Sequence, residues 1–369
     1  MRSVIAAASP RDYADFVVRR LPLLSAQVID LDAPPRGEPV LRSASRSAPR
    51  AEPRAVRLSI TDRCDLACVY CRPHRRDGYL ESERRLGVEG WATLVRGLVH
   101  KGVRRVRITG GEPLVHPLVV EIVRAVARIP GVEDVALTTN ATRLTELAGP
   151  LRDAGLARIN VSLDSLDGAR FFRLTRGGRL DQVLEGLEAA RSAGFVDSKL
   201  NTVVLGGEND HELPAITRFA WSIGATPRFL ERMRVGEGAR LAARIVPYEE
   251  MRARLADLLV DDEPAREADR GPARYVRARH GEGRVGFITG SSATFCDGCD
   301  RLRASSDGRL RACLAQNDSV DVAAAIRAND EAAIARGLEQ AWANKPDGSV
   351  FRGCNEESAA SVDMRATGG

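Results

Sequence analysis

The 369-residue chain lacks any run of about 18 apolar residues, the length that a membrane-spanning helix needs. It also lacks a strong excess of one charge, since 55 lysines and arginines face 50 aspartates and glutamates, a net charge of +5. This balance suits an anionic small-molecule substrate but gives no argument for nucleic acid. Hydrophobic residues make up 44% of the chain, which is typical of a globular protein. We therefore predict a protein that binds neither a membrane nor a nucleic acid.

The chain also lacks the even number of cysteines that a full set of disulfides would need, because it has seven. Six of them form two groups of three, at positions 64, 68 and 71 and at positions 296, 299 and 313, and Cys354 stands alone. No signal peptide precedes them, so the disulfide framework of a secreted protein is not expected. Clustered thiols in a reducing compartment favour metal ligation, and we predict a cytoplasmic protein.

The first 50 residues differ in composition from the rest. Residues 33–55 are rich in proline, arginine, alanine and serine and poor in apolar residues, which predicts a flexible N-terminal extension over residues 1–50. An organellar transit peptide is the alternative, but Asp12 and Asp15 argue against it, because such peptides contain few acidic residues.

From residue 55 the chain alternates between short strand patterns and helical patterns. Strands are expected at 55–60, 103–109, 132–139, 157–163, 198–205 and 226–233, and helices at 88–102, 118–130, 145–155, 180–194 and 211–224. Such βα units predict an α/β fold of parallel strands, with a partial (βα)6 TIM-like barrel as the leading choice and a doubly wound open sheet as the alternative. We place the barrel at residues 51–270 and a C-terminal domain at residues 271–369.

The unusual residues follow the strands. The stretch "TDRCDLACVYC" (61–71) follows the first strand, and "TGGEP" (109–113), "TTN" (138–140), "SLD" (162–164) and "ERM" (231–233) lie at the ends of later ones. Barrel enzymes assemble their active sites at the carboxyl ends of the strands. These motifs therefore predict a common site at that rim.

Cys64, Cys68 and Cys71 form a C-x3-C-x2-C pattern, three thiols on one tight loop. Three thiolates can hold three irons of a cubic 4Fe–4S cluster and leave the fourth iron open to a small molecule. The alternative is a zinc site, which needs four ligands, with His74 as the fourth.

This loop, with Tyr70 before the last cysteine and "GGEP" after the second strand, resembles the radical S-adenosylmethionine (SAM) enzymes. The resemblance implies that the three cysteines hold a 4Fe–4S cluster and that SAM chelates its open iron. One electron from the cluster would then cleave SAM to a 5′-deoxyadenosyl radical. It also implies a set of SAM-binding residues: Tyr70, Gly110, Gly111, Glu112, Thr138, Ser162 and Met233.

The second trio lies in "FCDGCDRLRASSDGRLRACL" (295–314), where Cys296, Cys299 and Cys313 follow the spacing C-x2-C-x13-C. A zinc ribbon completed by Cys354 or a histidine is one interpretation. The arginines at 301 and 303 favour another, because an arginine fork beside a metal site suits an anionic, phosphate-bearing ligand.

The second block, with Asp307-Gly308, Leu314 and the final Gly368-Gly369, is similar to the GTP 3′,8-cyclase (MoaA) family of radical SAM enzymes, over about residues 56–369. That resemblance implies a second 4Fe–4S cluster on Cys296, Cys299 and Cys313, whose open iron binds the guanine of GTP. It implies a lyase that makes 3′,8-cyclo-7,8-dihydro-GTP, the first step of molybdopterin biosynthesis. The glycine tail, Gly368 and Gly369, is expected to act in the site with Arg57, Arg107, Arg301 and Arg303 as catalytic residues.

The same resemblance implies a basic set that binds the triphosphate of GTP: Arg57, Arg105, Arg107, Lys199, Arg228, Arg301 and Arg303. The spacing of two of these arginines supports an anion site without the resemblance. Arg105 and Arg107 are two positions apart on one strand, so both point to the same side, where two cations inside a barrel require an anionic partner. Solvated charges on the outer face are the alternative.

Three departures from the family pattern leave a paralogue that acts on another nucleotide or natural product as an alternative. Arg72-Pro73 replaces the usual Met-Pro, Ala141 replaces the usual glycine, and the N-terminal extension replaces the usual lead-in. The expected partners are GTP, a flavodoxin- or ferredoxin-type reductant and the cyclic pyranopterin monophosphate synthase that uses the product, and a homodimer is possible. A zinc-containing nucleic-acid binder is the alternative that is not an enzyme.

Overall fold

The computed structural model describes residues 52–72, 78–262, 264–266, 271–346 and 364. The chain divides into two units, Met1–Arg50 and Ala51–Gly369, and every described residue belongs to the second. The predicted extension over residues 1–50 lies outside the described residues, as do His74, Cys354, Gly368 and Gly369.

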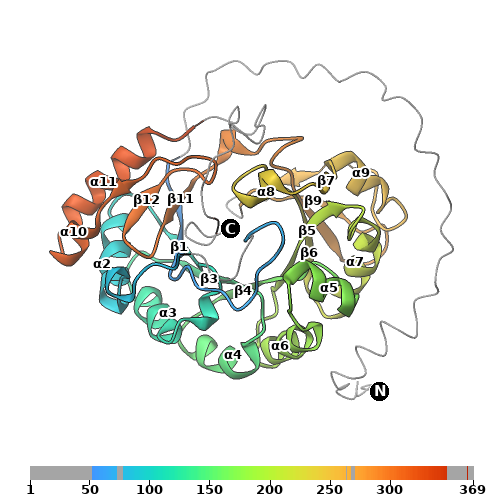
Figure 1. Ribbon diagram of the computed structural model, residues 1–369, viewed down its shortest axis with the longest axis horizontal. Coiled ribbons are helices and arrows are strands. Elements are labelled where there is room, and N and C mark those ends of the chain that lie inside the picture. The colour runs from blue at the N-terminus through green and yellow to red at the C-terminus, as the bar shows by residue number, and fades with distance from the viewer. Residues whose placement is uncertain (1–51, 73–77, 263, 267–270, 347–363, 365–369) are drawn as a thin grey trace. The chain divides into compact units, whose positions relative to one another are not determined.

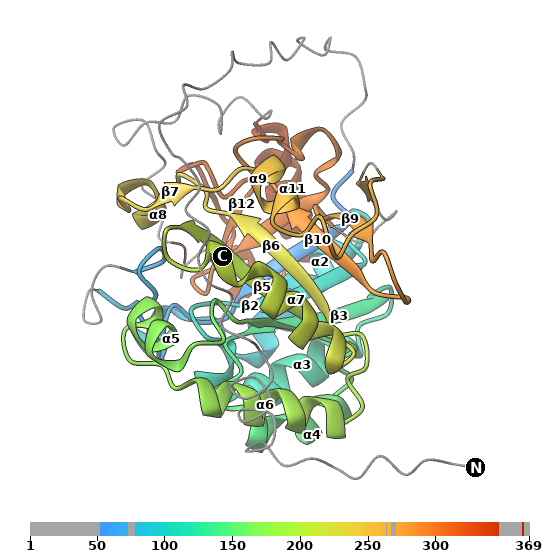
Figure 2. The same cartoon turned by 90° about the vertical axis from the view of Figure 1, so that its right-hand side faces the viewer.

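A continuous sheet forms the centre of the fold, and its six middle strands are the six that the sequence predicts. They are β1 (Ala55–Ser59), β2 (Arg105–Thr109), β3 (Asp134–Thr139), β4 (Arg158–Ser162), β5 (Lys199–Gly206) and β6 (Thr226–Glu231). Each pairs in parallel with the next, in the order of the sequence. The helices between them lie on the outside of the strands (Figures 1 and 2), so the predicted (βα)6 partial barrel is confirmed.

The crossover helices match the predicted segments within a few residues. They are α2 (Val88–Val99), α3 (Val119–Ala127), α4 (Leu144–Asp153), α6 (Leu180–Ser192) and α7 (Leu213–Ser222). Each turns an apolar face toward the strands; in α2 this face includes Trp91, Leu94 and Leu98, all fully buried. The predicted helix at 211–224 is divided, because a 3₁₀ turn (Asp210–Glu212) precedes Pro214 at the start of α7.

Helix α5 (Gly168–Thr175) was not predicted from the sequence. It lies between β4 and α6 along the chain, is eight residues long and buries only Phe171, Leu174 and Thr175. Asp167 caps its N-terminus, because the Asp167 carboxylate accepts from the Arg170 backbone N–H at 2.6 Å. A helix this short shows too few apolar repeats to be recognised by its period.

The C-terminal part of the chain extends the same sheet at both edges. Strand β10 (Arg284–Ile288) pairs in parallel with β6, and β11 (Arg301–Ala304) pairs in parallel with β1. Antiparallel strands continue each edge: β9 (Arg274–Arg277) and β8 (Ala265–Arg266) beyond β10, and β12 (Arg309–Arg311) and β13 (Val320–Asp321) beyond β11. The short β7 (Arg244–Ile245) pairs with β5, and α8 (Glu237–Arg240) and α9 (Tyr248–Ala253) flank it along the chain. The second cysteine trio is thereby brought beside β1.

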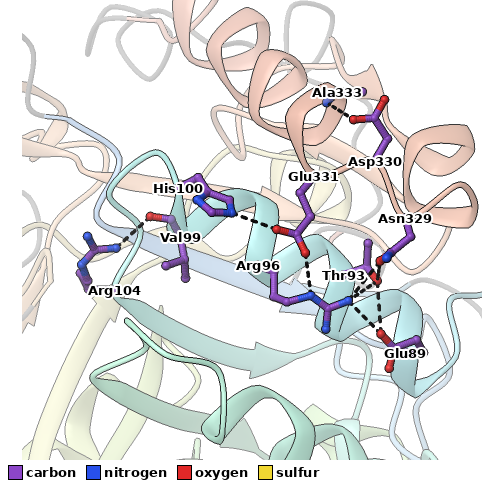
Figure 3. A network of polar contacts seen from close by, with 10 residues as sticks. All are labelled: Glu89, Thr93, Arg96, Val99, His100, Arg104, Asn329, Asp330, Glu331 and Ala333. Carbon is purple, nitrogen blue, oxygen red and sulfur yellow. Dashed lines mark hydrogen bonds and ion pairs between the residues drawn. The ribbon is translucent and has the colours of Figure 1, made fainter.

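The last two helices, α10 (Ala323–Arg327) and α11 (Glu331–Ala343), fasten this C-terminal segment to the barrel. The Glu331 carboxylate accepts from Arg96 Nε at 2.8 Å and lies 2.9 Å from His100 Nε2, both on α2 (Figure 3). The close approach requires Gly97, because a Cβ there would lie 2.7 Å from a side-chain carbon of Ile334. Within the described residues, no helix is long and apolar enough to cross a lipid bilayer.

Candidate active site

The strand ends and the C-terminal segment enclose a cavity of about 300 Å³. Both cysteine trios line it, and so do nearly all of the residues predicted to bind SAM or GTP. This volume is within the range of pockets that hold small organic ligands. Two groups of thiols that are more than 200 residues apart in the sequence therefore face one space. The order of strands and motifs in the sequence predicts only the first of them at the rim of the barrel.

The first trio lies on a tight loop directly after β1. The backbone N–H groups of Cys71 and Arg72 both donate to the Cys68 carbonyl at 3.0 Å. The glycine pair after β2 allows this loop to approach, because a Cβ at Gly111 would lie 2.3 Å from the Arg63 carbonyl oxygen and one at Gly110 would lie 2.4 Å from that of Thr61. In this space the Gly111 N–H donates to the Thr61 carbonyl at 2.6 Å, and the Glu112 N–H donates to the Arg63 carbonyl at 2.8 Å.

Helix α5 holds the other side of this loop. The N–H groups of Ala67 and Val69 donate to the carbonyls of Thr175 and Leu174, at 3.1 and 2.9 Å. Arg176, just after the helix, donates through Nη1 to the Arg72 carbonyl at 3.0 Å. Arg176 has a φ of 54°, a left-handed conformation that is unfavourable for a residue other than glycine. The loop that carries the first trio is therefore held between the glycine pair after β2 and helix α5.

Glu112 anchors the rim of β3. Its buried carboxylate accepts from the Thr139 hydroxyl and the Asn140 N–H, both at 2.7 Å, and from the Leu114 N–H at 3.0 Å. Burial, and secondarily Asp65, raises its pKa to about 8. The neighbouring Ala141 has a φ of 67°. This is the left-handed region, which glycine adopts without strain and other residues rarely occupy.

Tyr70 and Asp164 also line the cavity near the first trio. The Tyr70 hydroxyl donates to an Asp164 carboxylate oxygen at 2.6 Å, and the Val203 N–H donates to the other at 2.9 Å. Burial raises the pKa of Asp164 to about 6. The predicted SAM contacts Thr138, Ser162 and Met233 also line the cavity.

The second trio lies near β11, the strand that pairs with β1 on the side away from β2. The Cys299 N–H donates to the Cys296 carbonyl at 3.0 Å, and the Ala315 N–H lies 3.4 Å from the Cys313 sulfur. Arg301 Nη2 lies 3.4 Å from the Cys299 sulfur. Burial alone would raise the pKa of Cys299, but Arg301 and Lys345 lower it to about 7. Lys345 is fixed there by bonds from its Nζ to the carbonyls of Arg301 and Ala312, both 2.8 Å.

The donor sets fit iron–sulfur clusters. All six cysteines of the two trios have intermediate exposure, and in each trio a backbone N–H lies 3.4 Å from a sulfur, that of Leu66 at Cys64 and that of Ala315 at Cys313. In the first trio, three thiols from one short loop line the cavity, which suits a cluster that keeps one iron open toward a ligand. The second trio also supplies three thiols to the cavity, but Cys313 comes from the chain beyond β12. His74 and Cys354, the proposed completing ligands of a zinc site, lie outside the described residues.

Arginines form a row across the cavity wall. Parallel pairing places Arg57 level with Arg303 on one side and with Arg107 on the other, and Arg107 level with Ala136. Level residues on adjacent strands point to the same face of the sheet. A second row, two residues earlier, contains Arg301, Ala55, Arg105 and Asp134. Arg105 forms an ion pair with Asp300, the residue after Cys299.

These cations repel one another. Burial first, and then Arg303, Arg301 and Arg107, lowers the pKa of Arg57, and burial and Arg228 lower that of Arg107. Arg228 is 4% exposed and donates to the Asn201 and Asn160 side chains, both at 2.8 Å. Crowded buried cations are costly without an anion between them, so the wall is suited to a polyanionic ligand.

The structure brings together all but three of the predicted site residues. Lys199 is 3% exposed, lies 3.7 Å from the Asp197 carboxylate and is not among the residues that line the cavity. Gly368 and Gly369 fall outside the described residues, although Met364 is described and lines the cavity. Sequence reasoning did not single out Asp134, Arg158 or Lys345, because their roles depend on contacts between distant segments and no motif marks them. Asp164 belongs to the predicted rim motif "SLD" (162–164), but its contact with Tyr70 was not predicted.

Comparison with known proteins gives two family matches: the radical SAM superfamily over residues 58–220 and "Molybdenum Cofactor Synthesis C" over residues 225–351. The chain is 43% identical to GTP 3′,8-cyclase of Pseudomonas fluorescens over 74% of this chain and 83% of that protein. It is 40% identical to GTP 3′,8-cyclase 1 of Pseudomonas aeruginosa over 82% and 92%. Among solved structures it resembles Streptococcus suis SuiB bound to S-adenosylmethionine, with a TM-score of 0.58, 16% identity, and coverage of 81% of this chain and 67% of that one. This last likeness concerns the fold.

Proposed function

The chain belongs to the GTP 3′,8-cyclase family of radical SAM enzymes, and from that premise we propose that it converts GTP to 3′,8-cyclo-7,8-dihydro-GTP, the first step of molybdopterin biosynthesis. The observation that carries the proposal is that both cysteine trios and the arginine rows line one cavity. Such a cyclase must hold SAM and GTP in one site, because the radical formed from SAM takes a hydrogen atom from the ribose of GTP.

The first trio is proposed to hold a 4Fe–4S cluster with SAM. When bound, this pair supplies the one-electron chemistry that removes a hydrogen atom from ribose carbon 3′. The chain's own contribution is orientation. Glu112 and Asp164 place buried carboxyl groups near the trio, and the positive charges of bound SAM would favour their ionised forms. Tyr70, Thr138, Ser162 and Met233 line the surrounding wall.

The second trio and the arginine rows are proposed to hold GTP. Cys296, Cys299 and Cys313 would carry a second cluster against which the guanine lies, which would bring carbon 8 to ribose carbon 3′. Arg57, Arg107, Arg301 and Arg303 would bind the phosphates, since a guanidinium fork matches phosphate oxygens. Arg105 and Arg228 line the same wall, whereas Lys199 is buried and outside the lining, and its charge is close enough to be repelled by that of Arg228.

The remaining partners are also proposals. A flavodoxin- or ferredoxin-type protein would supply the electron, and a cyclic pyranopterin monophosphate synthase would use the product. Gly368 and Gly369 are proposed to reach the site, and the placement of Met364 at the cavity supports this.

The test is anaerobic turnover of the reconstituted protein with SAM, dithionite and GTP, followed by mass spectrometry. Formation of 5′-deoxyadenosine together with the cyclised nucleotide is expected. If 5′-deoxyadenosine forms without cyclised GTP, the substrate is a different molecule and the proposed reaction is wrong. If neither product forms and the protein contains zinc in place of iron, the assignment of both trios is wrong.

A further inference from the structure

The arginine row does not stop at Arg107. Pairing of β3 with β4 places Ala136 level with Arg158, so Arg303, Arg57, Arg107, Ala136 and Arg158 lie at one level across five adjacent strands. Both Ala136 and Arg158 line the cavity. Alanine carries no charge, so the row has a gap here, a position without a guanidinium between Arg107 and Arg158, on the cavity wall.

Arg158 is held by a carboxylate that lines the same cavity. Its Nε donates to Asp134 Oδ1 at 3.0 Å, and its Nη2 pairs with Asp134 Oδ2. This side-on arrangement uses two of the five guanidinium N–H groups, so the geometry leaves others directed away from Asp134. The two side chains are 22% and 21% exposed, so the pair is half-buried in the cavity wall.

Arg158 is also close enough to the other cations to affect them. It lowers the pKa of Arg107, of Arg228 and of Lys199 through charge repulsion, each time after burial and other causes. Arg158 therefore lies close both to the arginine row and to the cations of the next two strands, Lys199 on β5 and Arg228 on β6. An anion in the Ala136 gap would reduce all of these repulsions at once.

We propose that Arg158, oriented by Asp134, is a further phosphate-binding residue and contacts the terminal phosphate of the nucleotide. The inference rests on the proposed function, which places the base against the second cysteine trio beside β11. Arg158 is on β4, four strand spacings away along the sheet, at most about 19 Å. It is thus at the far end of the row from the base, where the last phosphate of an extended nucleoside triphosphate lies. Asp134 is a positioning residue and makes no contact with substrate.

The experiment measures equilibrium dissociation constants of GTP and GDP for the reconstituted holoenzyme, under anaerobic conditions and without turnover. Arg158→Met removes the charge and keeps most of the side-chain volume. We expect it to weaken GTP binding about 10- to 100-fold, as for loss of charge-assisted bonds to a phosphate, and to weaken GDP binding much less. Arg158→Lys should recover part of the GTP affinity, because charge is kept but the fork is lost.

Removal of Arg158 leaves the Asp134 carboxylate alone in an anion site, and this alone would repel a nucleotide. The double variant Arg158→Met with Asp134→Asn separates the two causes. If GTP binding stays weak in the double variant while GDP binding is close to that of the wild type, Arg158 binds the terminal phosphate. If the double variant regains the wild-type affinity for GTP, Arg158 only neutralises Asp134 and the inference is wrong.

A matched control exists on the surface. Arg179 and Asp181 form the same side-on pair, through Nε at 3.1 Å and a second Nη2 contact, but their side chains are 65% and 55% exposed. Arg179→Met should leave both affinities unchanged. Equal binding of GTP by Arg158→Met and wild type would also overturn the inference, while failure of the wild type itself to bind GTP would overturn the proposed function. Iron content and SAM binding verify that each variant is folded.

Discussion

The two cysteine trios face the same cavity but stand in opposite electrostatic surroundings. Around the first, burial and the carboxylates of Glu112 and Asp164 raise the pKa of Cys64 and of Cys68. Around the second, Arg301 and Lys345 overcome the effect of burial and lower the pKa of Cys299 to about 7. One end of the cavity is therefore suited to a cation and the other to an anion. The two cysteine patterns are similar, but the charged residues around them favour different ligands. The spacing of the cysteines does not predict this difference.

The largest effect that distinguishes the two ends should come from removing one thiol at a time. Cys68→Ser should abolish 5′-deoxyadenosine formation, whereas Cys299→Ser should abolish only the cyclised nucleotide and leave SAM cleavage in place. In each variant, iron should fall from about eight to about four per chain, since one of two clusters is lost. The products are measured by mass spectrometry and the iron by a colorimetric assay.

The comparison fails if the two variants lose the same product. Loss of 5′-deoxyadenosine in Cys299→Ser would mean that the trios act as one unit. Arg336→Met, on the exposed side of α11 and away from the cavity lining, serves as the control and should retain both products and all of the iron.

The second prediction concerns the positive charge of Arg303, at the end of the cavity that is suited to an anion. Arg303→Met should weaken GTP binding about 10- to 100-fold, because it removes a buried guanidinium that lines the cavity and is proposed to bind the phosphates, and it should leave the dissociation constant of SAM unchanged. Both constants are measured by anaerobic equilibrium dialysis. An equal loss of SAM affinity would show that the substitution disturbs the whole cavity, and the separation into two ends would be lost.

Part of this picture follows from sequence alone. The shared rim is predictable, because parallel strands end at one edge and each motif follows a strand. The common direction of Arg105 and Arg107 is predictable from their spacing of two. The level pairing of Arg57 with Arg303 is not, because it depends on β11 joining β1 from the opposite end of the chain. The pair of Arg158 with Asp134 requires the register of β3 and β4, which local patterns do not specify.

The third prediction concerns the thiols of the cluster-free protein. A lowered pKa means that the Cys299 thiol loses its proton at a lower pH, so about half is thiolate near pH 7. An ordinary thiol is thiolate to only a few per cent at that pH. Alkylation with iodoacetamide, mapped by mass spectrometry, should therefore modify Cys299 near pH 7 and Cys64 and Cys68 only at higher pH. Arg301→Met should shift the Cys299 profile upward, and identical profiles for Cys64 and Cys299 would contradict the comparison.

The smallest effect should come from the clamp on the first loop. Arg176 donates to the Arg72 carbonyl and holds a φ of 54°. Arg176→Gly loses the bond but adopts this backbone freely, whereas Arg176→Ala loses the bond and keeps the strain. The alanine variant should therefore be less stable than the glycine variant by about 1 kcal/mol, visible as a lower thermal midpoint. Both should lose iron from the first trio faster than from the second, as the decay of SAM cleavage relative to GTP binding would show. If the two variants have equal midpoints, the left-handed backbone at 176 is not maintained by the fold, and the clamp contributes only its hydrogen bond.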